Sequence, residues 1–267
     1  MNEGKIPPKE SSPEPVNTSG MERRIIETKS FKLAIIAEGD ANATKVALLC
    51  PGRLDTKDYV NFHQHLQTLS KKGFLAVAFD PPGTWESPGD INLFTTTNYI
   101  KSVNELIDFL GNRPTLLVGH SRGAATSLLV AKDNSNVIGV VALMPNLGSP
   151  TPPDQESIKK GYKLSKRDLP PGDQKTDEKK IFNLPIAYFE DGKQYDPASV
   201  AKTLKIPKMV IYADKDEFMT PQEAEETCKE IPEPKVIKEV SSTHDYRYYP
   251  EVIKATDELI ERFAETI

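Results

Sequence analysis

Residues 115–130 read Thr-Leu-Leu-Val-Gly-His-Ser-Arg-Gly-Ala-Ala-Thr-Ser-Leu-Leu-Val. An apolar run typical of a strand breaks at Gly-His-Ser-Arg-Gly and resumes with residues that favour a helix. A serine at the apex of such a turn adopts a strained backbone, so small residues are needed two positions before and after it. Gly119 and Gly123 stand at those positions around Ser121. The stretch therefore predicts an elbow that lifts the Ser121 hydroxyl clear of a sheet.

Outside this stretch, length and composition indicate one domain with a sizeable core, because the chain has 267 residues of which 37% are hydrophobic. The net charge of −5 argues against a nucleic-acid-binding surface. No window approaches the roughly 18 apolar residues that span a bilayer, and the N-terminus lacks the apolar segment of a signal peptide. We therefore expect a cytoplasmic protein in which Cys50 and Cys228 are free thiols.

Apolar runs alternate with amphipathic runs on both sides of the elbow. Besides the elbow strand and helix, we expect strands at 23–29, 31–38, 46–50, 74–79, 137–144, 208–212 and 235–240, and helices at 59–71, 98–110, 197–204, 221–231 and 252–263. The first two strands are expected to form an antiparallel pair. Strands that alternate with helices predict right-handed crossovers and an α/β, doubly wound, mostly parallel sheet.

Two segments differ in composition from this pattern. Residues 1–20 are rich in Pro, Glu, Ser and Lys, which predicts a flexible N-terminal tail before a domain at 21–267. The stretch from about 146 to 196 is polar and lacks a continuous apolar pattern, so we interpret it as a lid insertion. Its candidates for substrate contact are Tyr188, Phe189 and Tyr195.

A serine hydroxyl is a poor nucleophile at neutral pH, so Ser121 needs a histidine to take its proton. His120 is expected to point away along the turn, and His63 and His65 lie on an early helix facing different directions, without further residues that would complete a metal site. His244 follows the last predicted strand, whose carboxyl end delivers it to the same edge of the sheet as Ser121. His244 is therefore the predicted base.

Two carboxylates compete for the acid that orients this histidine. Asp214 and Asp216 both follow the predicted strand 208–212. The chain order Ser, Asp, His is the one found in α/β-hydrolases.

Over residues 23–267 the sequence resembles the α/β-hydrolase superfamily, with Gly-His-Ser-Arg-Gly as its nucleophile elbow. In that family the acid usually stands in a Gly-x-x-Asp pattern followed by a proline. Ala213-Asp-Lys-Asp216 with Pro221 is similar, with Ala in place of Gly. The resemblance thus implies Asp216 rather than Asp214 as the acid.

Two further stretches carry the resemblance. Pro51-Gly-Arg53 resembles the family's His-Gly turn, which implies that the backbone N–H groups of Arg53 and Arg122 form the oxyanion hole. The stretch 80–87 resembles an Asp-x-x-Gly-x-Gly-x-Ser loop in which Trp85 replaces the second glycine, either to contact substrate or for a structural reason.

These residues predict a serine hydrolase that cleaves a small-molecule ester, thioester or small amide through an acyl-enzyme. Of these substrates a carboxylic ester is the one we expect. No cofactor or metal is expected. The alternatives are a serine aminopeptidase-type peptidase, in which Glu190 or Asp191 would bind the substrate amine, and a non-catalytic binding protein of the same fold. The side chains of Arg53 and Arg122 would favour an anionic substrate if they face the cleft, and would otherwise pair with nearby acids.

Overall fold

An eight-stranded sheet runs through the residues that the computed structural model describes, 21–148 and 150–267. The predicted flexible tail lies outside these residues. The strand order is β1-β2-β4-β3-β5-β6-β9-β10; β2 is antiparallel to both neighbours, and all pairs from β4 to β10 are parallel. The doubly wound, mostly parallel sheet and its antiparallel first pair are thus confirmed. The strands are β1 Glu22–Glu27, β2 Lys32–Glu38, β3 Lys45–Cys50, β4 Phe74–Phe79, β5 Thr115–His120, β6 Val137–Leu143, β9 Lys208–Ala213 and β10 Lys235–Val240.

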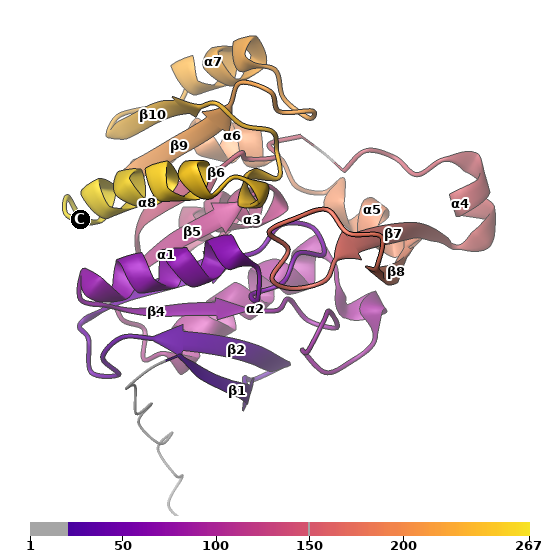
Figure 1. Ribbon diagram of the computed structural model, residues 1–267, viewed down its shortest axis with the longest axis horizontal. Helices are drawn as coiled ribbons and strands as arrows, with labels where there is room; N and C mark the ends of the chain where they lie inside the picture. Colours follow the sequence, from indigo (N-terminus) through magenta and orange to yellow (C-terminus); the bar gives the residue numbers. More distant parts are fainter. Residues whose placement is uncertain (1–20, 149) are drawn as a thin grey trace, which may run out of the picture.

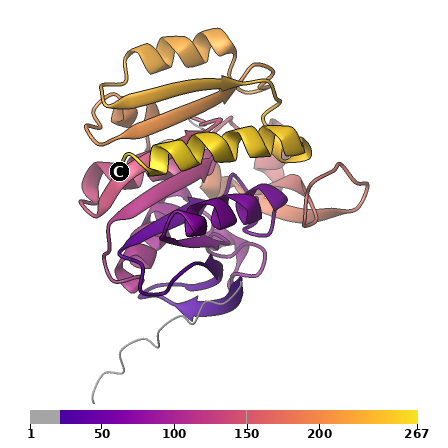
Figure 2. The same cartoon turned by 60° about the vertical axis from the view of Figure 1, so that its left-hand side comes forward.

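Helices cover both faces of this sheet, because the buried strands are apolar on both sides. In β5, Leu116 and Val118 pack with α1 and α8 on one face, and Leu117 packs with α2 and α3 on the other. Figures 1 and 2 show α1 and α8 on the same side of the sheet. The helices are α1 Val60–Lys71, α2 Thr96–Phe109, α3 Arg122–Asp133, α6 Pro197–Ala201, α7 Pro221–Lys229 and α8 Pro250–Ala264. Within the described ranges, no helix is long and apolar enough to cross a membrane.

The elbow forms where β5 passes into α3. Ser121 has φ 53° and ψ −116°, a backbone conformation that is costly for a residue with a side chain. A Cβ at Gly119 would lie 2.5 Å from backbone atoms of Gly123, and a Cβ at Gly123 would overlap the carbonyl oxygens of Cys50 and Pro51. The two glycines therefore let β5, α3 and the end of β3 pack closely.

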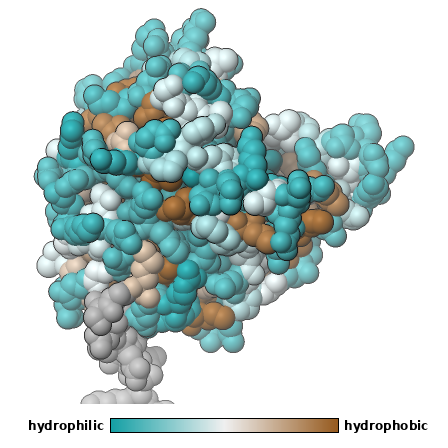
Figure 3. Space-filling view, in the orientation of Figure 1, coloured by the Kyte–Doolittle hydropathy of each residue, from teal (hydrophilic) through white to brown (hydrophobic). Residues whose placement is uncertain are grey.

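The segment 150–196, called here the projecting segment, stands off the carboxyl ends of the strands (Figures 1 and 2). It contains α4 Gln155–Lys160, an antiparallel hairpin of β7 Tyr162–Asp168 and β8 Lys179–Pro185, and α5 Ile186–Gly192. The sequence did not predict this hairpin, because its apolar side chains are few. Phe182 and Leu184 are buried against the body while Leu164 and Ile181 are exposed. Hydrophobic surface shows where the segment joins the body, on a face that is otherwise mostly hydrophilic (Figure 3).

Both cysteines are buried and unpaired, as expected from their positions in a strand and a helix of a chain without a disulfide framework. Burial raises the pKa of Cys50 to about 12 and that of Cys228 to about 11. Both sulfurs are therefore protonated at neutral pH and poor nucleophiles.

Candidate active site

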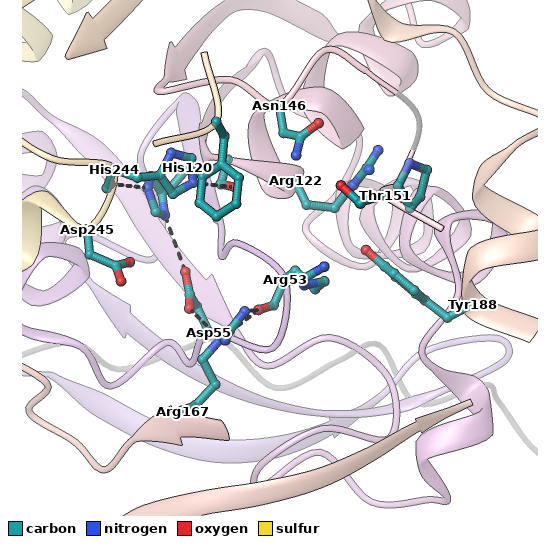
Figure 4. A pocket seen from close by; sticks show the side chains of 13 residues that line it. Arg53, Asp55, His120, Arg122, Asn146, Thr151, Arg167, Tyr188, His244 and Asp245 are labelled. Carbon is teal, nitrogen blue, oxygen red and sulfur yellow. Dashed lines mark hydrogen bonds and ion pairs between the residues drawn. The ribbon is translucent and has the colours of Figure 1, made fainter. Parts of the chain in front are cut away.

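A cavity of about 120 Å³ opens at the carboxyl ends of the parallel strands. Its lining comes from loops that follow successive strands and from the projecting segment (Figure 4). The loops after β3, β5, β6, β9 and β10 contribute Arg53, Ser121, Asn146, Phe218 and His244 respectively. Parallel strands place their carboxyl ends at one edge, so residues far apart in the chain meet here.

Ser121, His244 and Asp216 form one chain of hydrogen bonds. His244 Nε2 lies 2.8 Å from Ser121 Oγ, and His244 Nδ1 lies 2.8 Å from Asp216 Oδ2. A carboxylate only accepts, so the contact with Asp216 fits a proton on Nδ1 and leaves Nε2 as an acceptor for the serine hydroxyl. Ser121 and His244 are each only 8% exposed, which shields the pair from water. The arrangement can deprotonate a serine that attacks a carbonyl carbon.

Asp216 is held as a carboxylate by its neighbours. Burial acts to raise the pKa of Asp216, but the hydrogen bond and charge of His244 and the backbone N–H of Phe218 outweigh it and keep this pKa below its ordinary value. The competing acid, Asp214, instead accepts hydrogen bonds from Ser241 Oγ and the Ser242 backbone N–H, each at 2.9 Å. Of the two candidates, Asp216 is therefore the one in contact with His244.

Two backbone N–H groups near the elbow have no acceptor among the described residues. Arg122 is the first residue of α3, whose N-terminus carries a partial positive charge. Arg53 lies in the loop after β3, which packs against the start of α3 at Gly123. Among the described residues, neither the Arg53 N–H nor the Arg122 N–H has a hydrogen-bond partner. Both N–H groups are therefore free to donate to a ligand oxygen, as the donors of an oxyanion hole must be.

His120 does not point away from the site, contrary to the sequence-based expectation. It lines the cavity, its Nε2 lies 3.0 Å from the backbone carbonyl of His244, and its Nδ1 lies 3.2 Å from Asp55 Oδ2. Although burial acts to raise the pKa of Asp55, the hydrogen bond from His120 and the charges of Arg167 and Arg247 hold it well below its usual range. His120 thus links a buried carboxylate to the loop that carries His244.

Of the aromatic residues proposed as substrate contacts, Tyr188 lines the cavity and three others do not. Trp85 donates its Nε1–H to the Leu54 carbonyl and packs between the rings of Tyr59 and Phe182. Phe189 is fully buried behind Tyr188, and the Tyr195 hydroxyl contacts Thr97. Phe189 and Tyr195 thus have structural contacts in place of the expected substrate contact, and the contacts of Trp85 fit the structural one of its two alternatives.

The acids that an aminopeptidase would need also lie away from the cavity. Glu190 pairs with Lys193 at 2.8 Å, and Asp191 accepts from the backbone N–H of Thr97 at 2.9 Å. Neither lines the cavity.

Sequence reasoning missed several lining residues, namely Asp55, Asn146, Pro150, Thr151, Arg167, Phe218 and Asp245. Arg167 comes from the unpredicted hairpin and donates to the Arg53 carbonyl at 2.9 Å and 2.5 Å. Asp55 lies three residues after Gly52 in the loop that resembles the family's oxyanion turn, and this position is the signal that could have identified it.

Side chains that resemble metal ligands have protein partners instead. The carboxylates of Asp58, Asp80 and Glu86 lie close together, but Lys57 Nζ lies among them at 2.7, 3.1 and 2.5 Å. The two histidines of α1 have different partners and do not share a site. His65 contacts Asp257 and Tyr246, and His63 lies 3.6 Å from Asp58.

Comparison with known proteins agrees with this architecture. The family model described as alpha/beta hydrolase fold matches residues 46–167, and that of the PhoPQ-activated pathogenicity-related protein matches residues 184–267. Esterase EstD of Thermotoga maritima is 26% identical over 184 residues, covering 61% of this chain and 43% of that protein. A 2-hydroxy-6-oxononadienedioate/2-hydroxy-6-oxononatrienedioate hydrolase of a Pseudomonas species is 23% identical, covering 45% of this chain and 46% of that protein. The chain thus matches less than half the length of either curated relative.

Among solved structures, Est1E from Butyrivibrio proteoclasticus with bound ferulic acid superposes with a TM-score of 0.71 at 16% identity. The superposition covers 90% of this chain and 97% of Est1E. At this identity the similarity shows a shared fold.

Proposed function

We propose that this chain, which belongs to the α/β-hydrolase superfamily, hydrolyses a carboxylic ester through an acyl-enzyme on Ser121, with thioesters and small amides as the wider substrate class. The observation that carries the proposal is the hydrogen-bonded chain from Ser121 Oγ through His244 to Asp216, with 2.8 Å at each step. The esterase among the relatives adds support for an ester.

In this mechanism Ser121 Oγ attacks the ester carbonyl while His244 Nε2 takes the hydroxyl proton. The Asp216 carboxylate stabilises the imidazolium that forms. The N–H groups of Arg53 and Arg122 stabilise the oxyanion, each donor contributing about 2.7–4 kcal/mol in comparable sites. His244 then protonates the leaving alcohol, and water, deprotonated by His244, releases the acid from Ser121.

The projecting segment serves as the lid in this proposal. It contributes Arg167 and Tyr188 to the cavity, so the shape of the site depends on it. A cavity of about 120 Å³ is small beside ordinary ligand pockets of about 300–1,000 Å³. We therefore expect short acyl groups to react faster than long ones.

A fluorophosphonate probe tests the proposal, because it labels only an activated serine. Wild-type protein should be labelled and should hydrolyse p-nitrophenyl esters, and Ser121→Ala should lose both properties. Ser70→Ala, on α1, removes a hydroxyl that donates to the Gln67 carbonyl; it is the matched control and should behave as wild type. Wild-type protein that is neither labelled nor active would support the non-catalytic alternative and overturn the proposal.

A further inference from the structure

The charged residues around the cavity do not balance one another. Both lining acids already have partners: Asp55 contacts His120 and lies 3.4 Å from Arg167 Nε, and Asp245 pairs with Arg247. The charged lining residues other than histidine are Arg53, Asp55, Arg122, Arg167 and Asp245. No ion pair joins the guanidinium group of Arg53 or Arg122 to an acid among the described residues, although Asp55 lies near enough for its charge to act on Arg53.

Neither of these guanidinium groups has a hydrogen bond or ion pair within the described part of the chain. Arg122 is only 4% exposed, and Arg53 is half-buried. Burial lowers the pKa of Arg53, and the nearby charges of Arg167 and Arg122 act in the same direction, whereas Tyr188 and Asp55 oppose the shift. Holding two like charges beside each other, one buried and one half-buried, is unfavourable unless an anion lies between them.

A third donor faces the same space. The Tyr188 hydroxyl is buried and has no hydrogen-bond partner among the described residues. The Tyr188 ring stacks on the ring of Phe94, with 5.2 Å between the ring centroids. Figure 4 shows the Tyr188 hydroxyl pointing toward the side where the Arg53 and Arg122 side chains extend. A buried hydroxyl without a partner is costly, and a ligand oxygen would satisfy it.

We propose that the guanidinium groups of Arg53 and Arg122 and the hydroxyl of Tyr188 bind an anionic oxyacid group, a carboxylate or a phosphate, carried by the substrate close to its scissile bond. The inference rests on the proposed ester hydrolysis and names its substrate class. The same two arginines supply backbone N–H groups to the oxyanion hole, so the anion lies beside the reacting carbonyl. Their forked guanidinium groups match the paired oxygens of a carboxylate or phosphate.

Kinetics on a matched pair of esters test this site. p-Nitrophenyl hexanoate is the neutral substrate and mono-p-nitrophenyl adipate its carboxylate-bearing analogue, and the readout is the ratio of their kcat/KM values. The wild-type ratio should favour the adipate. Arg53→Gln and Arg122→Gln should each lower the ratio about tenfold or more, chiefly through KM for the adipate. Tyr188→Phe should lower it less, because a neutral donor is lost.

Two further variants make the result specific. Arg262→Gln removes one positive charge from an exposed position on α8 and should leave the ratio unchanged. Arg122→Lys keeps the charge but loses the fork, and should give an intermediate ratio. A ratio that is the same in wild type and in both glutamine variants, or a wild-type preference for hexanoate, overturns the anion site. Ser121-dependent hexanoate hydrolysis would then leave the proposed function standing.

Binding provides a readout that does not depend on turnover. Glutarate and inorganic phosphate, added separately, should raise the thermal unfolding midpoint of wild type and Arg262→Gln more than that of Arg53→Gln or Arg122→Gln. A shift with glutarate alone assigns a carboxylate, and a shift with phosphate alone assigns a phosphate. If neither ligand shifts the wild-type midpoint, or if all variants shift equally, the anion site is refuted whether or not the protein is an esterase.

Discussion

The substitution Asp216→Asn tests which of two carboxylates, Asp214 or Asp216, orients His244. Asp216 Oδ2 lies 2.8 Å from His244 Nδ1 and holds the proton there. An asparagine that turns its amide N–H toward Nδ1 favours the opposite tautomer, with the proton on Nε2 facing Ser121 Oγ. The histidine can then no longer accept the serine proton.

The expected loss follows from this reversal. In the best-studied serine hydrolase triad the same change lowers kcat about 10⁴-fold, so we expect a loss of about 10³–10⁴-fold, or about 4–5.5 kcal/mol of transition-state stabilisation. KM should change little, because Asp216 does not line the cavity. Asp214→Asn is the matched control in the same loop. Its contacts to Ser241 and Ser242 are structural, so we expect kcat to fall less than threefold.

The assay is hydrolysis of p-nitrophenyl hexanoate at neutral pH, with folded protein quantified from circular dichroism. Equal losses in Asp214→Asn and Asp216→Asn would contradict the assignment of the acid. More than a tenth of wild-type kcat in folded Asp216→Asn would refute the role of the hydrogen bond itself.

Three further predictions concern the scaffold of the site. Gly123→Ala places a Cβ on backbone carbonyl oxygens and should destabilise the fold by about 3 kcal/mol or more, lowering the thermal midpoint by about 6 °C or more; an unchanged midpoint would contradict the close packing at the elbow. His120→Phe removes a contact to the His244 carbonyl and should lower kcat about tenfold with little change in KM, whereas a change in KM alone would exclude a positioning role. Burial acts to raise the pKa of Asp168, but its hydrogen bonds with Lys179, Tyr248 and Arg247 lower it to about 2, below the ordinary value near 3.9. The ionised carboxylate therefore adds about 2 kcal/mol to the free energy of unfolding above about pH 4, and this contribution is lost as the pH falls toward 2. Urea unfolding of wild type and Asp168→Asn should therefore differ at pH 7 and converge near pH 2, and a constant difference would argue against the ion pair.

Most strands and helices were predictable because their side chains repeat with the period of the element. The buried runs at β3, β4 and β6 and the amphipathic stripes of α1, α2 and α8 lie within a few residues of their predicted limits. The β7–β8 hairpin was missed, since one of its faces meets solvent and only Phe182 and Leu184 pack inward. Its alternation is too short and too polar to be distinguished from a loop.

The sequence by itself determined the elbow, because the need for glycine around Ser121 is a local steric requirement that five consecutive residues express. The sequence also restricted the candidates for the catalytic histidine and acid to residues that follow predicted strands. Only the tertiary structure decided that Asp216 rather than Asp214 contacts His244 and that His120 contacts the His244 loop. It also decided that Arg53 and Arg122 line the cavity and form no ion pair with an acid of the described residues. These are contacts across more than 20 residues, and they depend on how separate loops meet at one edge of the sheet, which no local pattern encodes.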